Sequence, residues 1–207
     1  MKRVFSVDGK VYQKLAIVAE LVELNVAFLI AVLPIVTAGA AFTALYTVVN
    51  QLHGKDLVKP WPAFWRAFRI NWRKGTEAWL IILGVILLVA GGYVLIGSIS
   101  RSAELIMIPL TILCALIMLS MMYVFPLLAR YENSIRQTFA NSLVLALQNM
   151  IDSILVFLLG FIVCVYLPIF YWQFLFAWLL TAFSGTGYLQ MILFRRVFAR
   201  YEQPVQE

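Results

Sequence analysis

Charged residues and histidine are scarce in this sequence. Asp, Glu, Lys and Arg make up 13% of its 207 residues and apolar residues 63%, whereas soluble domains carry ~25% charged residues. This balance excludes an ordinary soluble domain. The single histidine, His53, excludes an HExxH zinc site and a histidine-based catalytic triad. No GxxxxGK[ST] phosphate loop is present either. We therefore expect a chain that is not an enzyme, with no catalytic residue, no cofactor and no metal site.

Cysteine is equally rare. Cys114 and Cys164 both lie within apolar runs. Two isolated thiols in lipid-embedded helices are typical of packing positions rather than of a disulfide or a metal site.

Long apolar runs dominate the remainder of the chain. A membrane-spanning helix needs ~20 apolar residues. We predict one all-α integral membrane domain over residues 1–207, polytopic, with about six transmembrane helices. The second run, "GAAFTALYTVVNQL", is short for a crossing, with ~21 Å of helix. The predicted spans cover residues 15–36, 39–52, 76–97, 105–128, 148–167 and 172–194.

The distribution of Lys and Arg predicts the orientation. If all six runs cross, Arg101 is the only one of the 16 Lys and Arg on the outer side. The positive-inside rule then favours cytoplasmic N- and C-termini in a cell membrane. The alternative is a re-entrant hairpin formed by the first two helices. The net charge of +6 flanks the spans, so we expect the bilayer's anionic headgroups as its partner and no nucleic acid.

The stretch "KPWPAFWRAFRINWRK" combines aromatic and basic residues. Its aromatic residues recur at helical spacing, and its arginines fall on the other face. We predict a cytoplasmic interfacial amphipathic helix over residues 61–74 that runs into the third span near Gly75. Its simpler role is to anchor that span, and the second is to dock a partner. The candidate docking residues are Trp61, Trp65, Arg66, Arg69 and Arg73.

Polar side chains near the inner ends of two spans form a candidate intramembrane cluster. Its members are Glu20, Glu23, Asn25, Gln148, Asn149 and Asp152. A carboxylate within a span suggests a function by default, and a buried one needs a partner. For the glutamates we expect snorkelling or pairing with Lys14 or a basic residue of the interfacial helix; the alternative is proton or cation coupling. For Asp152 we expect Asn50, Gln51, His53 or an interfacial arginine as partner in a structural cluster, and the alternative is a ligand vestibule.

Small residues in the spans predict helix contacts. In "TAFSGTGYLQ", residues 181–190, we favour close packing and hydrogen bonds between helices over a helix loosened around a binding site. Gly84 and Gly91 on the third span, and Ala40 and Ala44 on the second, are predicted contact seams.

Three segments resemble a known family: "FSVDGKVYQKL", "LNVAFLIAVLPIVTAGAAFTALYTVV" and "FWRAFRINWRKGTEAWLI". They resemble the YesL-like family of bacterial integral membrane proteins through the first ~80 residues, with a looser echo in "ARYENSIRQTFANSLVLAL". Members have no settled activity and are often encoded beside carbohydrate ABC transporters. The resemblance implies an accessory or regulatory role in carbohydrate ABC transport, with permease subunits as possible partners. The alternative is a small transporter or channel with a polar intramembrane path.

Overall fold

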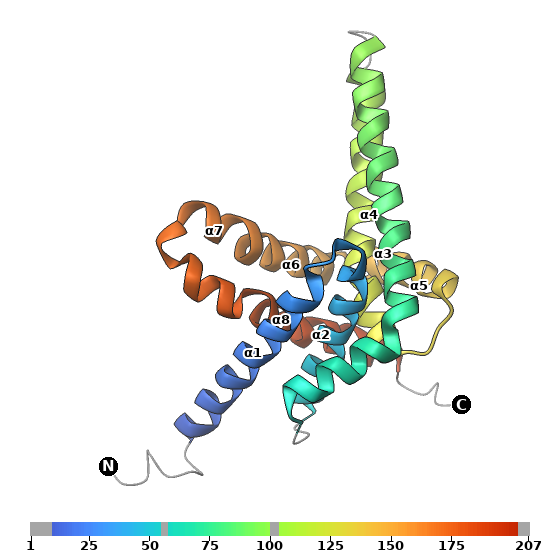
Figure 1. Cartoon of the computed structure of the whole chain (residues 1–207). Coiled ribbons are helices and arrows are strands. Elements are labelled where there is room, and N and C mark those ends of the chain that lie inside the picture. The colour runs from blue at the N-terminus through green and yellow to red at the C-terminus, as the bar shows by residue number, and fades with distance from the viewer. Residues whose placement is uncertain (1–9, 55–57, 100–103, 203–207) are drawn as a thin grey trace, which may run out of the picture.

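The computed structural model describes residues 10–54, 58–99 and 104–202, and these residues are almost entirely helical with no strand. The helices radiate from a shared centre (Figure 1). In chain order the elements are α1 (Lys10–Val32), η1 (Ile35–Thr37), α2 (Ala38–His53), α3 (Pro60–Ile99), α4 (Glu104–Arg130), α5 (Ile135–Gln148), α6 (Met150–Phe161), the π-helical η3 (Ile162–Tyr166), α7 (Leu167–Phe170), η4 (Trp172–Phe174) and α8 (Leu175–Tyr201).

The apolar helices confirm the prediction of an all-α polytopic membrane protein. Within the described residues, 5 segments are long and apolar enough to cross a membrane, and Cys114–Arg130 adds a shorter one. The predicted interfacial helix and third span form one uninterrupted helix, the 40-residue α3. How many of these segments cross the bilayer stays a prediction.

The short helix α2 lies at the centre of the molecule. Its 16 residues span ~24 Å, less than the ~30 Å of a bilayer's hydrocarbon core. It contacts α1, α3, α4 and α8, and most of its residues are buried. Ala40 and Ala44 are fully buried, which confirms the contact seam predicted for this helix. Protein rather than lipid therefore surrounds most of α2.

A proline separates α1 from α2. The first span was predicted to end at Val36, but α1 ends at Val32, because Pro34 disfavours helical backbone at Leu33. The Thr37 hydroxyl lies 2.6 Å from the Ala31 carbonyl oxygen and 2.8 Å from that of Pro34, so it can donate to either. The bond to Ala31 satisfies one of the carbonyl groups that the end of α1 leaves without a partner.

Helices α2 and α3 cross at two glycines. A Cβ atom on Gly39 would lie 2.1 Å from the Gly75 carbonyl oxygen and 2.5 Å from the Trp79 Cβ, and one on Gly75 would lie 2.7 Å from the Ala40 Cα. No side chain fits there. By contrast, the prediction that Gly84 and Gly91 form contact seams is wrong: apart from the local backbone of α3 itself, no described atom lies within 4 Å of a Cβ at either position.

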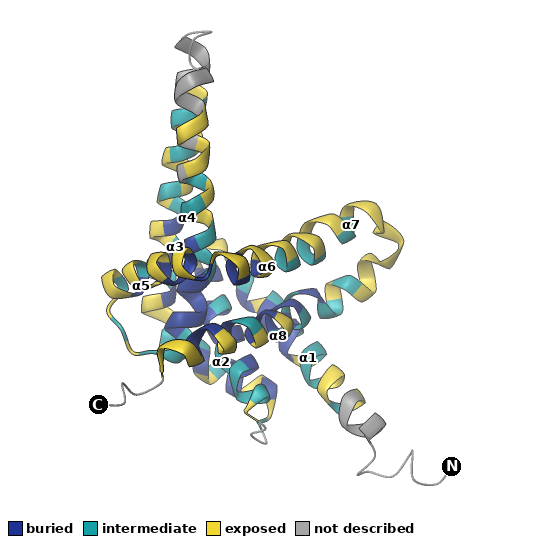
Figure 2. Cartoon of the chain, turned by 180° about the vertical axis from the view of Figure 1, so that it is seen from behind, coloured by how far each residue is buried: buried dark blue, intermediate teal, exposed yellow. Residues whose placement is uncertain are grey.

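Two hairpins and α1 extend away from the centre. Buried residues concentrate where the helices meet, while the α3–α4 hairpin and the hairpin from α6 to α8 are largely exposed (Figure 2). Their exposed residues are strongly apolar: Leu87 is 65% and Leu88 76% exposed on α3, and Phe176 is 77% exposed on α8. Such surfaces require lipid or another protein as their cover.

The fifth predicted span begins differently from its prediction. It was placed at residues 148–167, but α5 ends at Gln148, and Asn149 breaks the helix with φ −118° and ψ 50° before α6 begins at Met150. The Asn149 side chain donates to the Leu145 carbonyl oxygen at 3.1 Å, a local bond that competes with continued helix. Beyond α6, the chain passes through the π-helical turn η3, which the sequence analysis did not predict.

Candidate functional site

The aromatic residues at the start of α3 pack largely into the protein itself. Phe64 is completely buried, and Trp65 and Phe68 pack against the hydrophobic core. The rings continue outward, with the Trp61 and Trp65 centroids 6.1 Å apart and those of Phe68 and Trp72 5.4 Å apart. The sequence analysis placed this whole face at the lipid headgroups. That placement is wrong for Phe64, because α2 and its neighbours lie against it.

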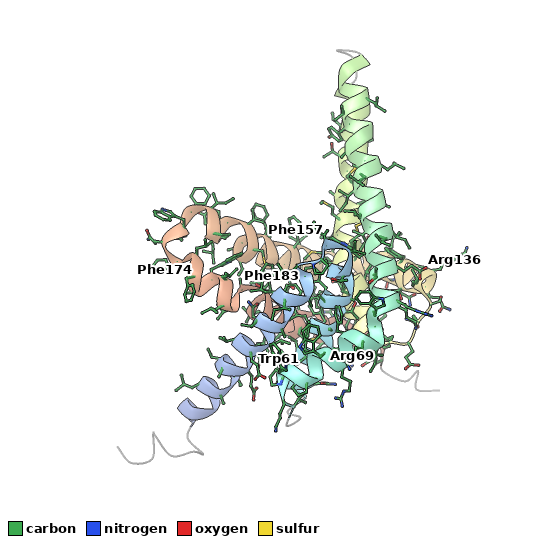
Figure 3. The ribbon with its side chains drawn as sticks, viewed as in Figure 1. Trp61, Arg69, Arg136, Phe157, Phe174 and Phe183 are labelled. Carbon is green, nitrogen blue, oxygen red and sulfur yellow. The ribbon has the colours of Figure 1, made fainter. Side chains whose placement is uncertain are left out.

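The basic residues of this segment point outward. Arg66, Arg69 and Arg73 are exposed, as is Trp61, whereas Trp65 is half-buried. In Figure 3, Trp61 and Arg69 lie at the end of the molecule opposite the tip of the α3–α4 hairpin. No ion pair joins these arginines to a carboxylate among the residues that the structure describes. The segment thus presents unneutralised positive charge on a helix whose other face is held by the core.

Glu23 of the predicted polar cluster holds the start of α3. Its Oε1 accepts a hydrogen bond from the Trp61 backbone N–H at 3.3 Å. This carboxylate takes up one of the free N–H groups of the helix N-terminus, where negative charge is favoured. Glu20 is half-buried and makes no hydrogen bond or ion pair with a described residue. Lys14, a predicted partner, has its side chain outside the described part.

Asn25 joins α1 to α8. It is fully buried, and its Nδ2 donates to the Leu179 carbonyl oxygen at 2.8 Å, while its Oδ1 accepts from the Ser184 N–H at 2.9 Å. The Ser184 hydroxyl in turn donates to the Leu21 carbonyl oxygen at 2.7 Å. Both side chains therefore serve as interhelical hydrogen-bond partners, the packing role that was favoured for Ser184.

Gln148, Asn149 and Asp152 of the predicted polar cluster lie at the α5–α6 break. Arg200 donates to Asn149 Oδ1 at 2.8 Å and to Asp152 Oδ2 at 3.2 Å, where it also forms an ion pair. Asn149 Nδ2 donates to the Tyr201 hydroxyl at 2.9 Å, and that hydroxyl donates to Gln148 Oε1 at 2.8 Å. The end of α8 is thereby fastened to this break.

The partner expected for Asp152 is corrected by these contacts. The sequence analysis expected Asn50, Gln51, His53 or an arginine of the interfacial helix, and the partner is Arg200 instead. It was missed because the last span was ended at Phe194. Helix α8 continues to Tyr201, about two turns further, and brings Arg200 alongside Asp152.

The two halves of the predicted polar cluster do not meet. Asn25 is bonded at Ser184 and Asp152 at Arg200, and these two α8 residues are separated by ~24 Å along the helix. Between them lies a polar link that sequence reasoning missed. The Tyr46 hydroxyl donates to Gln190 Oε1 at 2.6 Å, and Gln190 Nε2 donates to the Val156 carbonyl oxygen at 3.0 Å. The sequence features that could have predicted this link were one tyrosine in an alanine-rich run and one glutamine deep in the last span.

A second ion pair fixes the chain just beyond α8. Arg130 donates to both carboxylate oxygens of Glu202, at 2.9 and 2.6 Å, and the Tyr131 hydroxyl donates to the same carboxylate. Burial raises the pKa of Tyr131 to about 12, and its bond to Glu202 contributes. That hydrogen bond lowers the pKa of Glu202; partial burial opposes the shift, and Arg130 lowers the pKa further.

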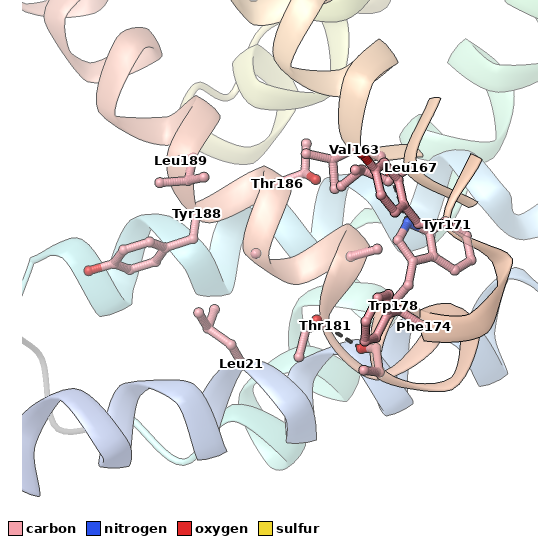
Figure 4. A pocket seen from close by; sticks show the side chains of 13 residues that line it. Leu21, Val163, Leu167, Tyr171, Phe174, Trp178, Thr181, Thr186, Tyr188 and Leu189 are labelled. Atoms are coloured by element: carbon pink, nitrogen blue, oxygen red, sulfur yellow. Dashed lines mark hydrogen bonds between the residues drawn. The ribbon is translucent and has the colours of Figure 1, made fainter. Parts of the chain in front are cut away.

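An apolar cavity of about 740 Å³ lies between α1, η3 and α8 (Figure 4). Trp178 lines it and donates from Nε1 to the Val163 carbonyl oxygen of the π-helical turn at 2.6 Å. Thr181, Gly185 and Thr186 line it, whereas Gly187 packs against Leu45. Helix α8 is continuous through residues 181–190, so these residues line the cavity and pack against neighbours without a loosened helix. This lining suits hydrocarbon rather than a polar substrate.

Residues 21–93 match the family described as "Protein of unknown function, DUF624". No curated protein and no solved structure matches the chain. The matched segment contains about half of α1, all of α2, the Gly39–Gly75 crossing and the basic start of α3. Residues 21–93 are thus similar to a DUF624 domain, the domain that YesL-like proteins carry.

Proposed function

We propose that this chain is a non-enzymatic accessory or regulatory protein that binds a partner membrane protein through the basic face of α3. The observation that carries the proposal is the row of exposed arginines Arg66, Arg69 and Arg73 on a helix whose aromatic face packs on the core. A helix held in this way presents its charges with little loss of conformational freedom on binding. Such preorganisation favours association.

The partner that we propose is a permease subunit of a carbohydrate ABC transporter. The resemblance to YesL-like proteins supports this choice, because their genes often neighbour those of such transporters. We place the chain in the bacterial cytoplasmic membrane with both termini inside, since the basic residues 59–74 would then face the cytoplasm. The exposed apolar hairpins offer additional surface to a partner within the bilayer.

The pairing of the polar residues supports an accessory role over a small transporter. A transporter needs polar groups that a substrate can reach along a path. Here Asn25 is bonded within the α1–α8 contact, and Asp152 is paired with Arg200. Glu20 and Glu23 lie on α1, and neither takes part in the polar contacts at the α5–α6 break.

The test is affinity purification from native membranes in mild detergent, with mass spectrometry of the proteins that accompany this chain. We expect ABC permease subunits with the wild type and a loss of most of that signal in the double variant Arg69→Ala, Arg73→Ala. These two arginines are chosen because both are exposed and neither takes part in an ion pair with a described residue.

The matched control is Arg195→Ala, Arg196→Ala, which removes the same charge from α8. This control is expected to retain the partner. A wild-type protein that purifies alone, together with solute flux into liposomes that contain only this chain, would instead establish the transporter. If both double variants lost the partner equally, the loss would reflect the lower net charge of the protein and not a docking face on α3.

A further inference from the structure

A polar cavity of about 420 Å³ lies between the start of α3, the end of α2 and the end of α4. Three cationic residues from two of these helices line it: Arg66 and Lys74 of α3 and Arg130 of α4. Gln51 of α2 and Asn71 of α3 add side-chain amides. Its volume lies in the range of small-molecule binding sites, ~300–1,000 Å³. Cations and amides here converge on one space rather than spreading over a convex surface.

Two of the three cations lack a carboxylate partner among the described residues. Arg66 has none, and Lys74 Nζ donates only to the Asn133 carbonyl oxygen, at 3.3 Å. Arg130 is already paired with Glu202, and Glu132 at the rim contributes one negative charge. The lining therefore keeps a net positive charge.

A buried amide also lacks a partner at this cavity. Gln51 Oε1 is inaccessible to solvent and accepts no hydrogen bond from the part of the chain that the structure describes. Leaving a buried polar atom unpaired costs free energy. A half-turn of the amide about its last bond exchanges Oε1 for Nε2, whose N–H groups are donors. Because this position is closed to solvent, the amide belongs to the cavity wall, and Arg66 and Lys74 supply the groups that a ligand can reach.

We propose that this cavity is a binding site for an anionic phosphate group. The arginine supplies a planar fork that matches phosphate oxygens, and the lysine supplies a compact charge. Phosphate can reach the site as an anionic phospholipid headgroup or as a soluble phosphate. Basic pockets between transmembrane helices are known to take lipid headgroups. The site can bind phosphate whether or not the chain has a protein partner.

The structure provides a matched pair of variants. Arg66→Gln, Lys74→Gln removes two charges that line the cavity. Arg69→Gln, Arg73→Gln removes two charges from the same helix that do not line it. All four residues are exposed, so both variants are expected to fold. Gel filtration and helical circular dichroism check this. If the first pair fails to fold, Lys74→Gln alone replaces it.

The experiment measures the thermal unfolding of the purified protein in neutral detergent. Three probes are titrated separately: short-chain phosphatidylglycerol, inorganic phosphate, and short-chain phosphatidylcholine as a zwitterionic control. We expect phosphatidylglycerol, inorganic phosphate or both to raise the unfolding temperature of the wild type. The apparent affinity should fall by about tenfold or more in the Arg66–Lys74 variant and stay near the wild-type value in the Arg69–Arg73 variant.

Each outcome of this titration either supports or overturns the phosphate site. Stabilisation by phosphatidylglycerol alone identifies a lipid headgroup, and stabilisation by inorganic phosphate alone, or by both probes, identifies a site for the phosphate group itself. No stabilisation of the wild type by either probe overturns the site. Equal weakening in both double variants overturns it too, because general surface charge would then explain the effect. Equal stabilisation by phosphatidylcholine would overturn the proposal, because the net negative charge of the headgroup would then not matter for binding. The docking test uses Arg69 and Arg73, so either proposal can fail alone.

Discussion

Both halves of α3 contain glycine and large apolar residues, but these residues have different surroundings. Near its start, Gly75 touches the backbone of α2 and Phe64 is completely buried. Further along, Gly84 and Gly91 meet no described atom, and Leu88 is 76% exposed. Glycine and leucine therefore do not by themselves show which part of a membrane helix is covered by protein. The cover comes from another element, and here that element is α2.

The largest expected effect contrasts two leucines. Leu45→Ala, at a position only 2% exposed, should lower the free energy of unfolding by about 2–5 kcal/mol, because a cavity remains in the core. Leu88→Ala should change it by less than ~0.5 kcal/mol, since this side chain touches little protein. Denaturant unfolding in detergent measures both. Similar losses would show that the α3–α4 hairpin is covered in the free protein.

The two glycines should respond with opposite signs. Gly75→Ala places a methyl group 2.7 Å from the Ala40 Cα and should cost roughly 1–3 kcal/mol. Gly84→Ala meets open space and should stabilise the helix by up to ~1 kcal/mol, as alanine is the better helix former. The same unfolding measurement compares them. A stable Gly75→Ala protein would show that α2 and α3 do not cross at these residues.

Removing an interhelical hydrogen bond should have an intermediate effect. Asn25→Ala deletes both bonds to α8 and should destabilise the protein by about 1–2 kcal/mol. Ser184→Ala, which loses one bond to Leu21, should cost less. The double variant should cost less than the two single losses combined, since the groups share one contact. Full additivity would contradict that coupling.

The smallest expected effect is a loss of stability in acid. The folded pKa of Glu202 lies below its ordinary value of 4.5, so its contribution is present at neutral pH and is lost as the pH falls through the folded pKa. The exposed pair contributes little. Thermal unfolding of wild type and Glu202→Gln should differ at pH 7 and converge well below pH 4.5. A difference that persists in acid would exclude this carboxylate as its cause.

Much of the fold was predictable because membrane helices are recognised by local hydropathy. The basic and aromatic faces of residues 61–74 followed from helical spacing alone. Sequence could not show that α2 lies inside the protein, because an alanine-rich run has the same pattern against lipid or against another helix. The depth of Phe64 and the emptiness around Gly84 depend on that placement.

The polar sites, too, were only partly predictable from the sequence. Gln148, Asn149 and Asp152 could be grouped because they are close in sequence. Their link to Arg200 could not, since it depends on how far α8 continues and where it returns. The Tyr46–Gln190 bond joins residues 144 positions apart, and a lone polar side chain in each helix did not show that the two meet. Long-range polar contacts of this kind can be predicted only when the arrangement of the helices is known.

The most direct test of the proposed accessory role is photo-cross-linking from position 69 in native membranes. A photoreactive amino acid replaces Arg69 at the exposed basic face, and matched probes replace Val48 in the core and Leu88 on the hairpin. Mass spectrometry identifies the cross-linked products. We predict that position 69 is cross-linked to an ABC permease subunit while position 48 reacts only within this chain. Cross-links from position 69 to lipid alone would contradict a protein partner at this face.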